Sequence, residues 1–302
     1  MINIDNISKS YYDTPALKGI SLKINEGEIY GLIGPDGAGK TTLMRILMTL
    51  ILPDSGEATM EGKNVVKDFK KIRKIVGYMP ERFSLYQDLS VIENLNFFAT
   101  VFGTTVEENY DLIRDIYVRI EPFKKRRAGQ LSGGMKQKLA LSCALIHKPR
   151  ILILDEPTTG VDAVSRKEFW DMLKRLREKG ITIMVSTPYM DEANLCDRVA
   201  LIQKGEILNV DTPDGITEKF HRKIIRVRSD EIYRLINDLR EYNKTESAFA
   251  FGQFVHFTGL KDEVSADEIN SYLKAKNHKN IAIKEIKPGI EDVFMSLMKQ
   301  KS

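Results

Sequence analysis

A glycine-rich segment at residues 34–42, GPDGAGKTT, constrains the fold of this chain more than any other feature. It matches the pattern G-x-x-x-x-G-K-[ST] and lies between a predicted strand over residues 29–33 and a predicted helix over residues 41–52. Glycines let the backbone turn so that successive N–H groups face one phosphate, and the helix N-terminus adds partial positive charge. We therefore expect a phosphate-binding loop, in which Lys40 reaches the terminal phosphates and the Thr41 hydroxyl binds Mg²⁺.

An apolar run that ends in two carboxylates, ILILDEP, occupies residues 151–157. Ligands of open α/β sheets bind at the carboxyl ends of the strands, so Asp155 and Glu156 are expected beside the phosphate loop. Asp155 would then hold Mg²⁺, directly or through water, and Glu156 would be the catalytic residue that polarises the attacking water. By itself, such a pair could also be a helix cap.

A second anion-binding pattern, LSGGMKQ, occupies residues 131–137 just before a predicted helix over residues 135–147. Ser132 and the two glycines after it would stand at the start of that helix, where backbone N–H groups bind anions. One chain has no use for two phosphate cradles around one nucleotide, so this one is expected to serve a neighbouring subunit. The local alternative is an N-cap followed by a flexible turn.

Strands and helices alternate along the first two thirds of the chain, which predicts an α/β core with a mainly parallel sheet. The turn-rich stretch DTPDGIT at residues 211–217 predicts a boundary between one domain over residues 1–215 and a small α+β domain over residues 218–302. The further predicted strands cover residues 2–7, 22–24, 151–154, 181–186, 224–228, 254–258 and 281–286. The further predicted helical segments cover residues 91–119, 166–179, 231–239, 266–275 and 290–299.

The composition excludes several classes of protein. Of 302 residues, 42% are hydrophobic and 29% charged, which suits a globular chain with a real core. No run approaches the ~18 apolar residues that a membrane span requires, and the polar start MINIDNISKS does not fit a secretory signal. Two cysteines cannot form a disulfide framework, and a net charge of +4 is too small to indicate nucleic acid, which is not expected as a partner.

The segments GPDGAGKTT, LSGGMKQKL, ILILDEP and TTGVDAVSR, in this order, resemble the ATP-binding subunit of ABC transporters over residues 1–215. The resemblance implies a P-loop NTPase core, an N-terminal antiparallel β subdomain and an inserted helical subdomain over about residues 83–145. It also implies ATP and Mg²⁺ as cofactors and head-to-tail pairing with a second ATP-binding subunit, either identical or different. The ATP contacts of one subunit would then be Gly34, Pro35, Asp36, Gly37, Ala38, Gly39, Lys40, Thr41 and Thr42, and those of the other Leu131, Ser132, Gly133, Gly134 and Met135.

The resemblance assigns roles to four further positions. Tyr11 precedes Lys40 by the spacing at which the family stacks an aromatic ring on adenine; Tyr12 is the fallback, and both could instead pack on the sheet. Asp162 matches the loop through which the two sites sense each other. Glu81 stands where glutamine is usual, and it can still bind Mg²⁺ or orient water, although it adds negative charge.

Pro188 is the most serious departure from the family pattern. The family usually has a histidine after the strand that ends near Thr187, and here the segment is STPYMDEA. Proline has neither a polar side-chain atom nor an N–H group, so it cannot contact the γ-phosphate. We therefore expect intact ATP binding and hydrolysis that is slow or dependent on a partner. Thr187 and Tyr189 are the candidate substitutes for the missing contact.

The resemblance also implies membrane partners. FSLYQDLSVIENL at residues 83–95 resembles the segment that docks on the membrane subunit, although Phe83, Leu85 and Tyr86 could equally be local core. The motifs and the closing IEDVFMSLM look most like drug and antibiotic exporters of the ABC-2 type, which implies separate permease subunits and a place on the cytoplasmic face of the cell membrane. The alternatives are a soluble ABC-type ATPase of DNA repair or translation and a nucleotide-gated regulatory subunit with little turnover.

Overall fold

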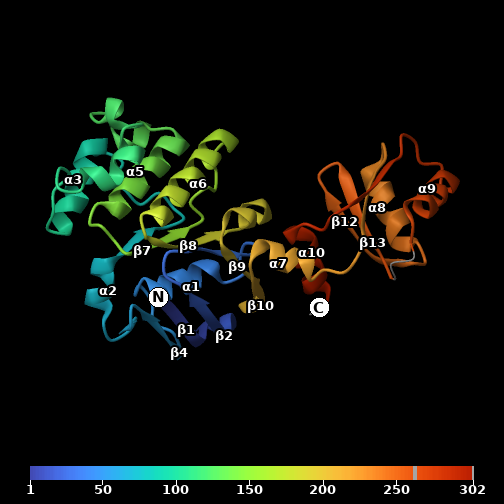
Figure 1. Cartoon of the computed structure of the whole chain (residues 1–302), viewed down its shortest axis with the longest axis horizontal. Helices are drawn as coiled ribbons and strands as arrows, with labels where there is room; N and C mark the ends of the chain where they lie inside the picture. Colours follow the sequence, from blue (N-terminus) through green and yellow to red (C-terminus); the bar gives the residue numbers. More distant parts are fainter. Residues whose placement is uncertain (261–263, 301–302) are drawn as a thin grey trace. The chain divides into compact units, whose positions relative to one another are not determined.

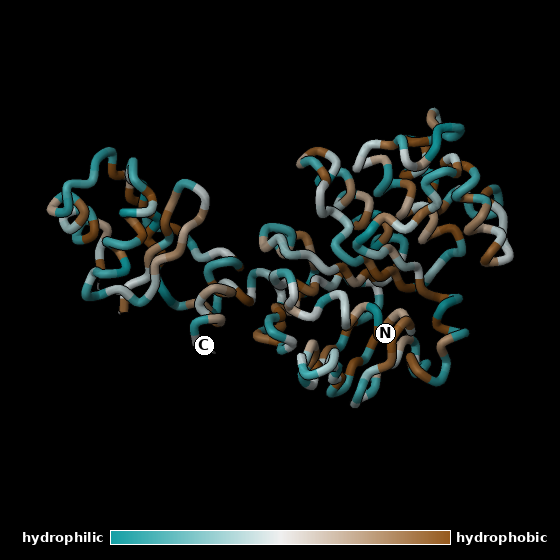
Figure 2. Tube along the Cα trace, turned by 180° about the vertical axis from the view of Figure 1, so that it is seen from behind, coloured by the Kyte–Doolittle hydropathy of each residue, from teal (hydrophilic) through white to brown (hydrophobic). Residues whose placement is uncertain are grey.

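The computed structural model describes residues 1–260 and 264–300, and it divides into two compact units, Met1–Pro213 and Asp214–Ser302 (Figure 1). Each unit has a hydrophobic core of its own. Hydrophobic segments run through the middle of the first unit, and hydrophilic segments form many of its outer loops (Figure 2). Within the described residues, no helix combines the length and apolar character needed to cross a membrane.

The first unit is built on two sheets. A four-stranded antiparallel sheet has the order β2-β1-β4-β5, and a six-stranded sheet has the order β10-β9-β3-β8-β7-β6. In the larger sheet every neighbouring pair is parallel except β9 with β10. The predicted α/β core with a mainly parallel sheet and an N-terminal antiparallel sheet is therefore confirmed. The strands are β1 (Ile2–Tyr11), β2 (Thr14–Ile24), β3 (Ile29–Ile33), β4 (Ser55–Met60), β5 (Lys63–Asn64), β6 (Val76–Met79), β7 (Ile151–Asp155), β8 (Thr182–Thr187), β9 (Arg198–Gln203) and β10 (Glu206–Asp211).

The three central strands of the larger sheet, β3, β7 and β8, are buried along their whole length. A parallel strand covered on both faces needs a continuous apolar sequence rather than an alternating one, as in ILILD of β7. The helices of this unit are α1 (Lys40–Leu47), α2 (Phe69–Ile75), α3 (Val91–Val101), α4 (Tyr110–Tyr117), α5 (Gly133–Leu145) and α6 (Ala163–Glu178), with short 3-10 turns at Glu121–Phe123, Ala128–Gln130 and Met190–Leu195.

Two predicted helical segments were wrong in extent. The helix predicted over residues 41–52 ends at Leu47, because the chain becomes left-handed at Thr49 (φ 60) and the N–H groups of Thr49 and Leu50 donate to the carbonyls of the last helical turn. The stretch predicted as helical over residues 91–119 is two helices, because Gly103 (φ 70) takes the left-handed position just after the first.

Strands β9, β10 and β12 were not predicted, and the strand predicted over residues 22–24 is only the end of a longer β2. Short apolar runs such as RVALIQ in β9 have no periodicity that separates a strand from a helix. Strand β9 has its conformation through pairing with β3, which is distant in sequence. Strands β10 and β12 are edge strands that pair with the adjacent strands β9 and β13, through short turns at Lys204–Gly205 and Gly252.

The second unit follows the chain order βαββαβ, and its four-stranded sheet has the order β12-β13-β11-β14 with all neighbours antiparallel. This is the ferredoxin-like arrangement. Residues of α8 and α9 share one core with residues of the sheet, including Leu235, Leu273 and Phe257. The elements are β11 (Ile224–Arg228), α8 (Ile232–Glu241), β12 (Thr245–Phe251), β13 (Phe254–Gly259), α9 (Ala266–Ala275), β14 (Ala282–Ile286) and α10 (Ile290–Gln300), and α7 (Pro213–Glu218) lies at the division between the units.

Candidate active site

The glycine-rich loop connects the buried strand β3 to the start of α1. Gly37 and Gly39 have positive φ angles of 75° and 106°, which favour glycine. A Cβ atom on Gly39 would lie 2.5 Å from the carbonyl oxygen of Ala16, and one on Gly34 would lie 2.1 Å from that of Ile202. The loop borders a cavity of about 280 Å³, whose lining residues are Tyr11, Ala16, Asp36, Gly37, Ala38, Gly39, Lys40, Thr41, Thr42, Glu81 and Glu156.

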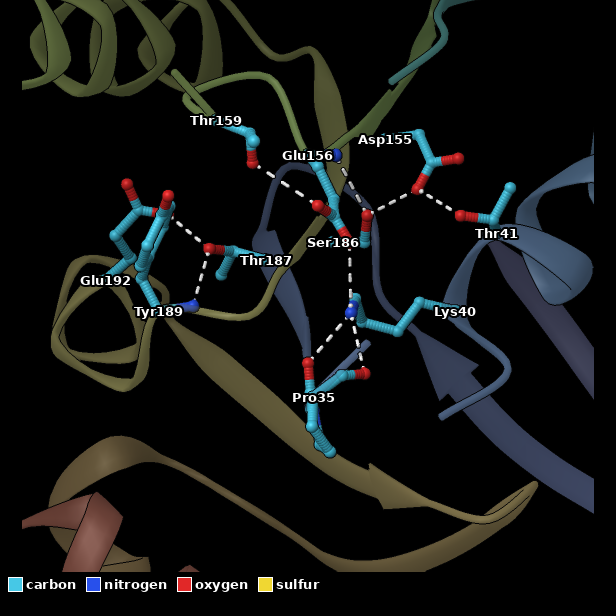
Figure 3. A network of polar contacts seen from close by, with 11 residues as sticks. Pro35, Lys40, Thr41, Asp155, Glu156, Thr159, Ser186, Thr187, Tyr189 and Glu192 are labelled. Atoms are coloured by element: carbon cyan, nitrogen blue, oxygen red, sulfur yellow. Dashed lines mark hydrogen bonds and ion pairs between the residues drawn. The ribbon is translucent and has the colours of Figure 1, made fainter. Parts of the chain in front are cut away.

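Lys40 is buried at the base of this loop, with 3% of its surface exposed. Its Nζ atom donates to the carbonyl oxygens of Gly34 at 2.8 Å and Pro35 at 3.0 Å, and it lies 3.0 Å from Oε1 of Glu156 (Figure 3). An ammonium group has three hydrogens, so all three have an acceptor. The buried cation is thus held at one place by two backbone groups and one carboxylate.

Asp155 ends strand β7 and is fully buried. Its Oδ1 atom accepts hydrogen bonds from the hydroxyls of Ser186 at 2.6 Å and Thr41 at 3.2 Å. Its Oδ2 atom is buried and has no hydrogen-bond partner among the described residues. Burial raises the pKa of the Asp155 carboxyl above its ordinary value, and the two hydroxyls oppose that shift. A buried, unpaired carboxylate oxygen beside a threonine hydroxyl fits the oxygen ligands that Mg²⁺ prefers.

Glu156 has a left-handed backbone (φ 50), a conformation that is strained for a residue with a side chain. Its N–H group donates to the carbonyl oxygen of Ser186 at 3.1 Å and to the hydroxyl of Ser186 at 3.0 Å. Its Oε2 atom accepts a hydrogen bond from Thr159 at 3.3 Å. Strand β8 therefore holds the strained residue from one side, and the segment that follows it holds the carboxylate from the other.

Pro188 follows β8 and is half-buried. The hydroxyl of Thr187 donates to Glu192 at 2.6 Å and accepts from the N–H of Tyr189 at 3.1 Å. The ring of Tyr189 lies 4.4 Å from the guanidinium of Arg166. Both candidate substitutes for a histidine at this position are thus already engaged in contacts elsewhere.

The segment Leu131–Met135 lies at the start of α5, outside the set of described residues that line the cavity. Ser132 caps α5 by accepting from the N–H of Met135 at 3.4 Å, and both Ser132 and Gly133 are exposed. A Cβ atom on Gly134 would lie 2.5 Å from Oγ of Ser165. The glycine therefore lets α5 approach α6 closely at this end.

Asp162 caps α6, and its Oδ1 atom accepts from the N–H groups of Val164 at 3.1 Å and Ser165 at 3.0 Å. Tyr11 borders the cavity with 42% of its surface exposed, whereas Tyr12 is fully exposed and does not pack on the sheet. Glu81 also borders the cavity. The structure thus brings Tyr11, Glu81 and Glu156 together around the loop.

Known proteins of similar sequence point to a family for this chain. Residues 17–159 match a family model described as "ABC transporter". The chain is 38% identical to the probable multidrug ABC transporter ATP-binding protein YbhF of Escherichia coli K12, over 99% of this chain and 52% of that protein. It is 32% identical to the Nod factor export ATP-binding protein I of Rhizobium sp. strain N33, over 98% of this chain and 96% of that protein. The chain belongs to the ABC transporter family.

A third relative in the family is the linearmycin resistance ATP-binding protein LnrL of Bacillus subtilis, which is 32% identical over 98% of both chains. The chain spans only about half the length of YbhF.

Two solved structures of the family resemble the fold. One is the ATP-binding subunit of an ABC transporter, with a TM-score of 0.67 and 26% identity over 73% of this chain and 93% of that one. The other is the ATP-binding cassette MJ0796 in a dimeric post-hydrolysis state bound to ADP and Pi, with a TM-score of 0.65 and 28% identity over 70% of this chain and 98% of that one.

Several residues that build the site were missed by sequence reasoning. Ser186 pairs with Asp155 across the parallel strands and bonds both carboxylate residues. Thr158 and Glu192 bond each other at 2.7 Å although 34 residues separate them. The available signal was a group of small polar residues directly after the apolar runs of β7 and β8, where the carboxyl ends of neighbouring parallel strands meet.

Proposed function

We propose that this chain binds and hydrolyses ATP as the nucleotide-binding subunit of an ABC transporter. The observation that carries the proposal is the meeting of Lys40, Thr41, Asp155 and Glu156 at the carboxyl ends of β3 and β7, around a glycine cradle. A lysine cation, a hydroxyl group and two carboxylates arranged in this way suit the transfer of a phosphoryl group to water. Tyr11 borders the same cavity, in a place to stack on adenine.

Each residue has a distinct task in the proposed reaction. Backbone N–H groups of the loop hold the phosphates, and Lys40 exchanges one of its three present acceptors for a phosphate oxygen. If that acceptor is Glu156, the carboxylate becomes free to accept a hydrogen bond from the attacking water. Thr41 and Asp155 would hold Mg²⁺, with Glu81 as a further carboxylate at the rim; the bound ion offsets charge on the phosphates.

The first test removes the proposed general base. Glu156→Gln keeps the shape of the side chain but loses its negative charge, so phosphate release should fall by about 10²-fold or more while ATP binding persists. Binding of a fluorescent ATP analogue and release of phosphate from the purified chain measure the two effects. Lys40→Ala is the matched control, because it should lose binding as well as turnover. Equal turnover in Glu156→Gln and the wild type would contradict the assignment.

We further propose that Pro188 limits the rate of hydrolysis. Thr187 and Tyr189 are bonded to Glu192 and stacked on Arg166, so neither side chain supplies the contact that a histidine would make. We expect binding to persist when this position is changed, because the described residues that line the cavity do not include Pro188.

Pro188→His should therefore raise turnover at least about 10-fold, since one preorganised donor is worth about 10²–10³-fold in rate in other enzymes. Pro188→Ala restores the backbone N–H without the imidazole, and it should leave turnover near that of the wild type. Steady-state phosphate release at saturating ATP is the measurement. Unchanged turnover in Pro188→His would show that another step sets the rate.

We also propose that two ATP-binding subunits pair head to tail and share each ATP. Ser132 and Gly133 are exposed at the start of α5, a helix of 13 residues whose N-terminal N–H groups suit an anion. Their segment lies apart from the cavity beside Lys40. A second subunit, either another copy or a related chain, would bring its own segment to that cavity.

Ser132→Glu should prevent this pairing, because it places a negative charge where the partner's phosphates would lie. ATP binding to the single chain should persist, and turnover should fall by about 10²-fold. Size-exclusion chromatography with ATP in a Glu156→Gln background should show a dimer that the added Ser132→Glu change removes. Full turnover in Ser132→Glu would contradict the shared site.

We propose that the chain powers export through separate permease subunits on the cytoplasmic face of the cell membrane. The relatives named above act in multidrug transport, Nod factor export and linearmycin resistance by their names, and they give no support to the alternatives in DNA repair or translation. For this chain, the export of drugs or antibiotics is part of the proposal.

An apolar cavity of about 570 Å³ in the first unit suits the docking of the permease. It is bordered by Leu85, Phe98, Phe102 and Val101, of which Val101 is 61% exposed. Leu85 is buried, whereas Tyr86 is 49% exposed, so the segment predicted to dock contributes both to the local core and to the surface. Exposed apolar side chains beside such a cavity are typical of a protein interface.

Val101→Asp should weaken permease binding at least about tenfold, because docking would bury an unpaired charge. Phosphate release by the isolated chain should stay unchanged, since Val101 is not among the described residues that line the cavity beside Lys40. The measurement is recovery of a multi-span membrane protein with the tagged chain from solubilised membranes. The matched control is Val118→Asp, because Val118 is exposed at the C-terminal end of α4. Recovery of ribosomes or DNA without a membrane protein would contradict the transporter proposal.

A further inference from the structure

Glu192 is a carboxylate buried to 99% of its surface, yet it lies outside the set of described residues that line the cavity. It stands in the 3-10 turn Met190–Leu195 that follows β8. Its Oε2 atom accepts from the hydroxyl of Thr187 at 2.6 Å (Figure 3). Its Oε1 atom accepts from the hydroxyl of Thr158 at 2.7 Å. Burial of a carboxylate raises the free energy of the folded chain unless such hydrogen bonds satisfy it, so the two hydroxyls are needed where they stand.

The two hydroxyls belong to the two segments that flank the chemistry. Thr158 comes two residues after Glu156, and Thr187 comes directly between Ser186 and Pro188. One carboxylate therefore joins the segment behind the proposed general base to the segment that contains the proline. These segments leave the sheet from neighbouring strands, β7 and β8, and their bonding through Glu192 continues the link that Ser186 makes to Asp155 and Glu156.

The strained backbone of Glu156 makes this link consequential. A left-handed non-glycine residue persists only where its surroundings determine it from more than one side. On the N-terminal side, Ser186 accepts a hydrogen bond from the N–H group of Glu156. On the C-terminal side, the N–H of Thr159 donates to the carbonyl oxygen of Glu156 at 3.2 Å, and Glu192 holds Thr158 through its hydroxyl. Without Glu192, the chain after Glu156 would lose its connection to β8 on that side.

The proline segment depends on the same carboxylate. Proline has no N–H group to bond, and the next residue, Tyr189, donates its N–H to the hydroxyl of Thr187 at 3.1 Å. That hydroxyl gives its own hydrogen to Glu192. Arg166 adds charge to the cluster, with Nε 3.7 Å from Oε1 of Glu192 and its guanidinium over the ring of Tyr189.

We propose that Glu192 is a positioning residue for ATP hydrolysis, which fixes the segment after Glu156 relative to the segment around Pro188. The inference rests on the proposed function. A misplacement of ~1 Å at a reacting centre can cost ~10²-fold in rate. Because two of the three contacts of Lys40 are made within the phosphate loop itself, removal of Glu192 should lower kcat and leave the affinity for ATP nearly unchanged.

The experiment measures kcat per nucleotide-binding site and the Kd for a fluorescent ATP analogue on the full chain. In Glu192→Ala, kcat should fall at least about tenfold, and Kd should stay within about threefold. Glu192→Gln should recover most of the loss, because its carbonyl accepts from one threonine and its amide can donate to the other. Thr158→Val added to Glu192→Ala should lower kcat no further than Glu192→Ala alone, since the two residues share one bond.

Thr182→Val is the matched control. Thr182 is a buried threonine of β8, the strand that also contains Thr187, and its hydroxyl accepts from the N–H of Gly27, far from the reacting groups. The kcat of this variant should match the wild type. If Glu192→Ala does not fold, Thr158→Val carries the test alone at nearly constant volume. A kcat within threefold of the wild type, or a Kd weakened tenfold together with kcat, would overturn the positioning role. A wild-type chain that binds ATP without turnover would instead contradict the proposed function.

Discussion

The parallel pairing of β7 with β8 is the constraint on which the rest of the site depends. It places Asp155 beside Ser186 at the carboxyl edge of the sheet, and one serine then bonds the side chain of Asp155 and the backbone of Glu156. Both strands are buried along their whole length, so their register cannot slip without moving apolar side chains that are packed on both faces. Close packing of ordinary aliphatic residues thereby sets the position of two carboxylates.

The charged groups around β7 and β8 are only partly satisfied by one another. Lys40 is a buried cation and is matched by Glu156, whereas Asp155 keeps one buried oxygen that no described residue satisfies. Such an oxygen raises the free energy of the folded chain unless a ligand meets it, since a buried acceptor without a partner costs about 1–3 kcal/mol. Under the proposed function, Mg²⁺ would meet this oxygen, and a cost of this kind is typical of functional sites.

Much of the fold was predictable because the informative signals were local. The apolar run before Asp155 and the glycine loop after β3 each lie within ten residues, and both carry their physical cause in the residues themselves. The missed features were partly tertiary, although β10 and β12 form hairpins with the adjacent strands β9 and β13. Strand β9 has its conformation through pairing with β3, and the end of α1 depends on Thr49, a residue with no strong preference for the left-handed region. The bond between Thr158 and Glu192 likewise joins positions that no periodicity relates.

At Pro188, the sequence and the tertiary structure give complementary information. From the sequence it is a loss, because a proline supplies no contact to phosphate. In the structure it stands inside a segment that Thr187 and Glu192 already fix, so the segment is ordered although proline offers no polar side-chain atom. A proline at this position restricts the backbone further, since its φ is confined. Under the proposed function, the segment therefore keeps its rigidity, while its proline supplies no side-chain contact to the nucleotide.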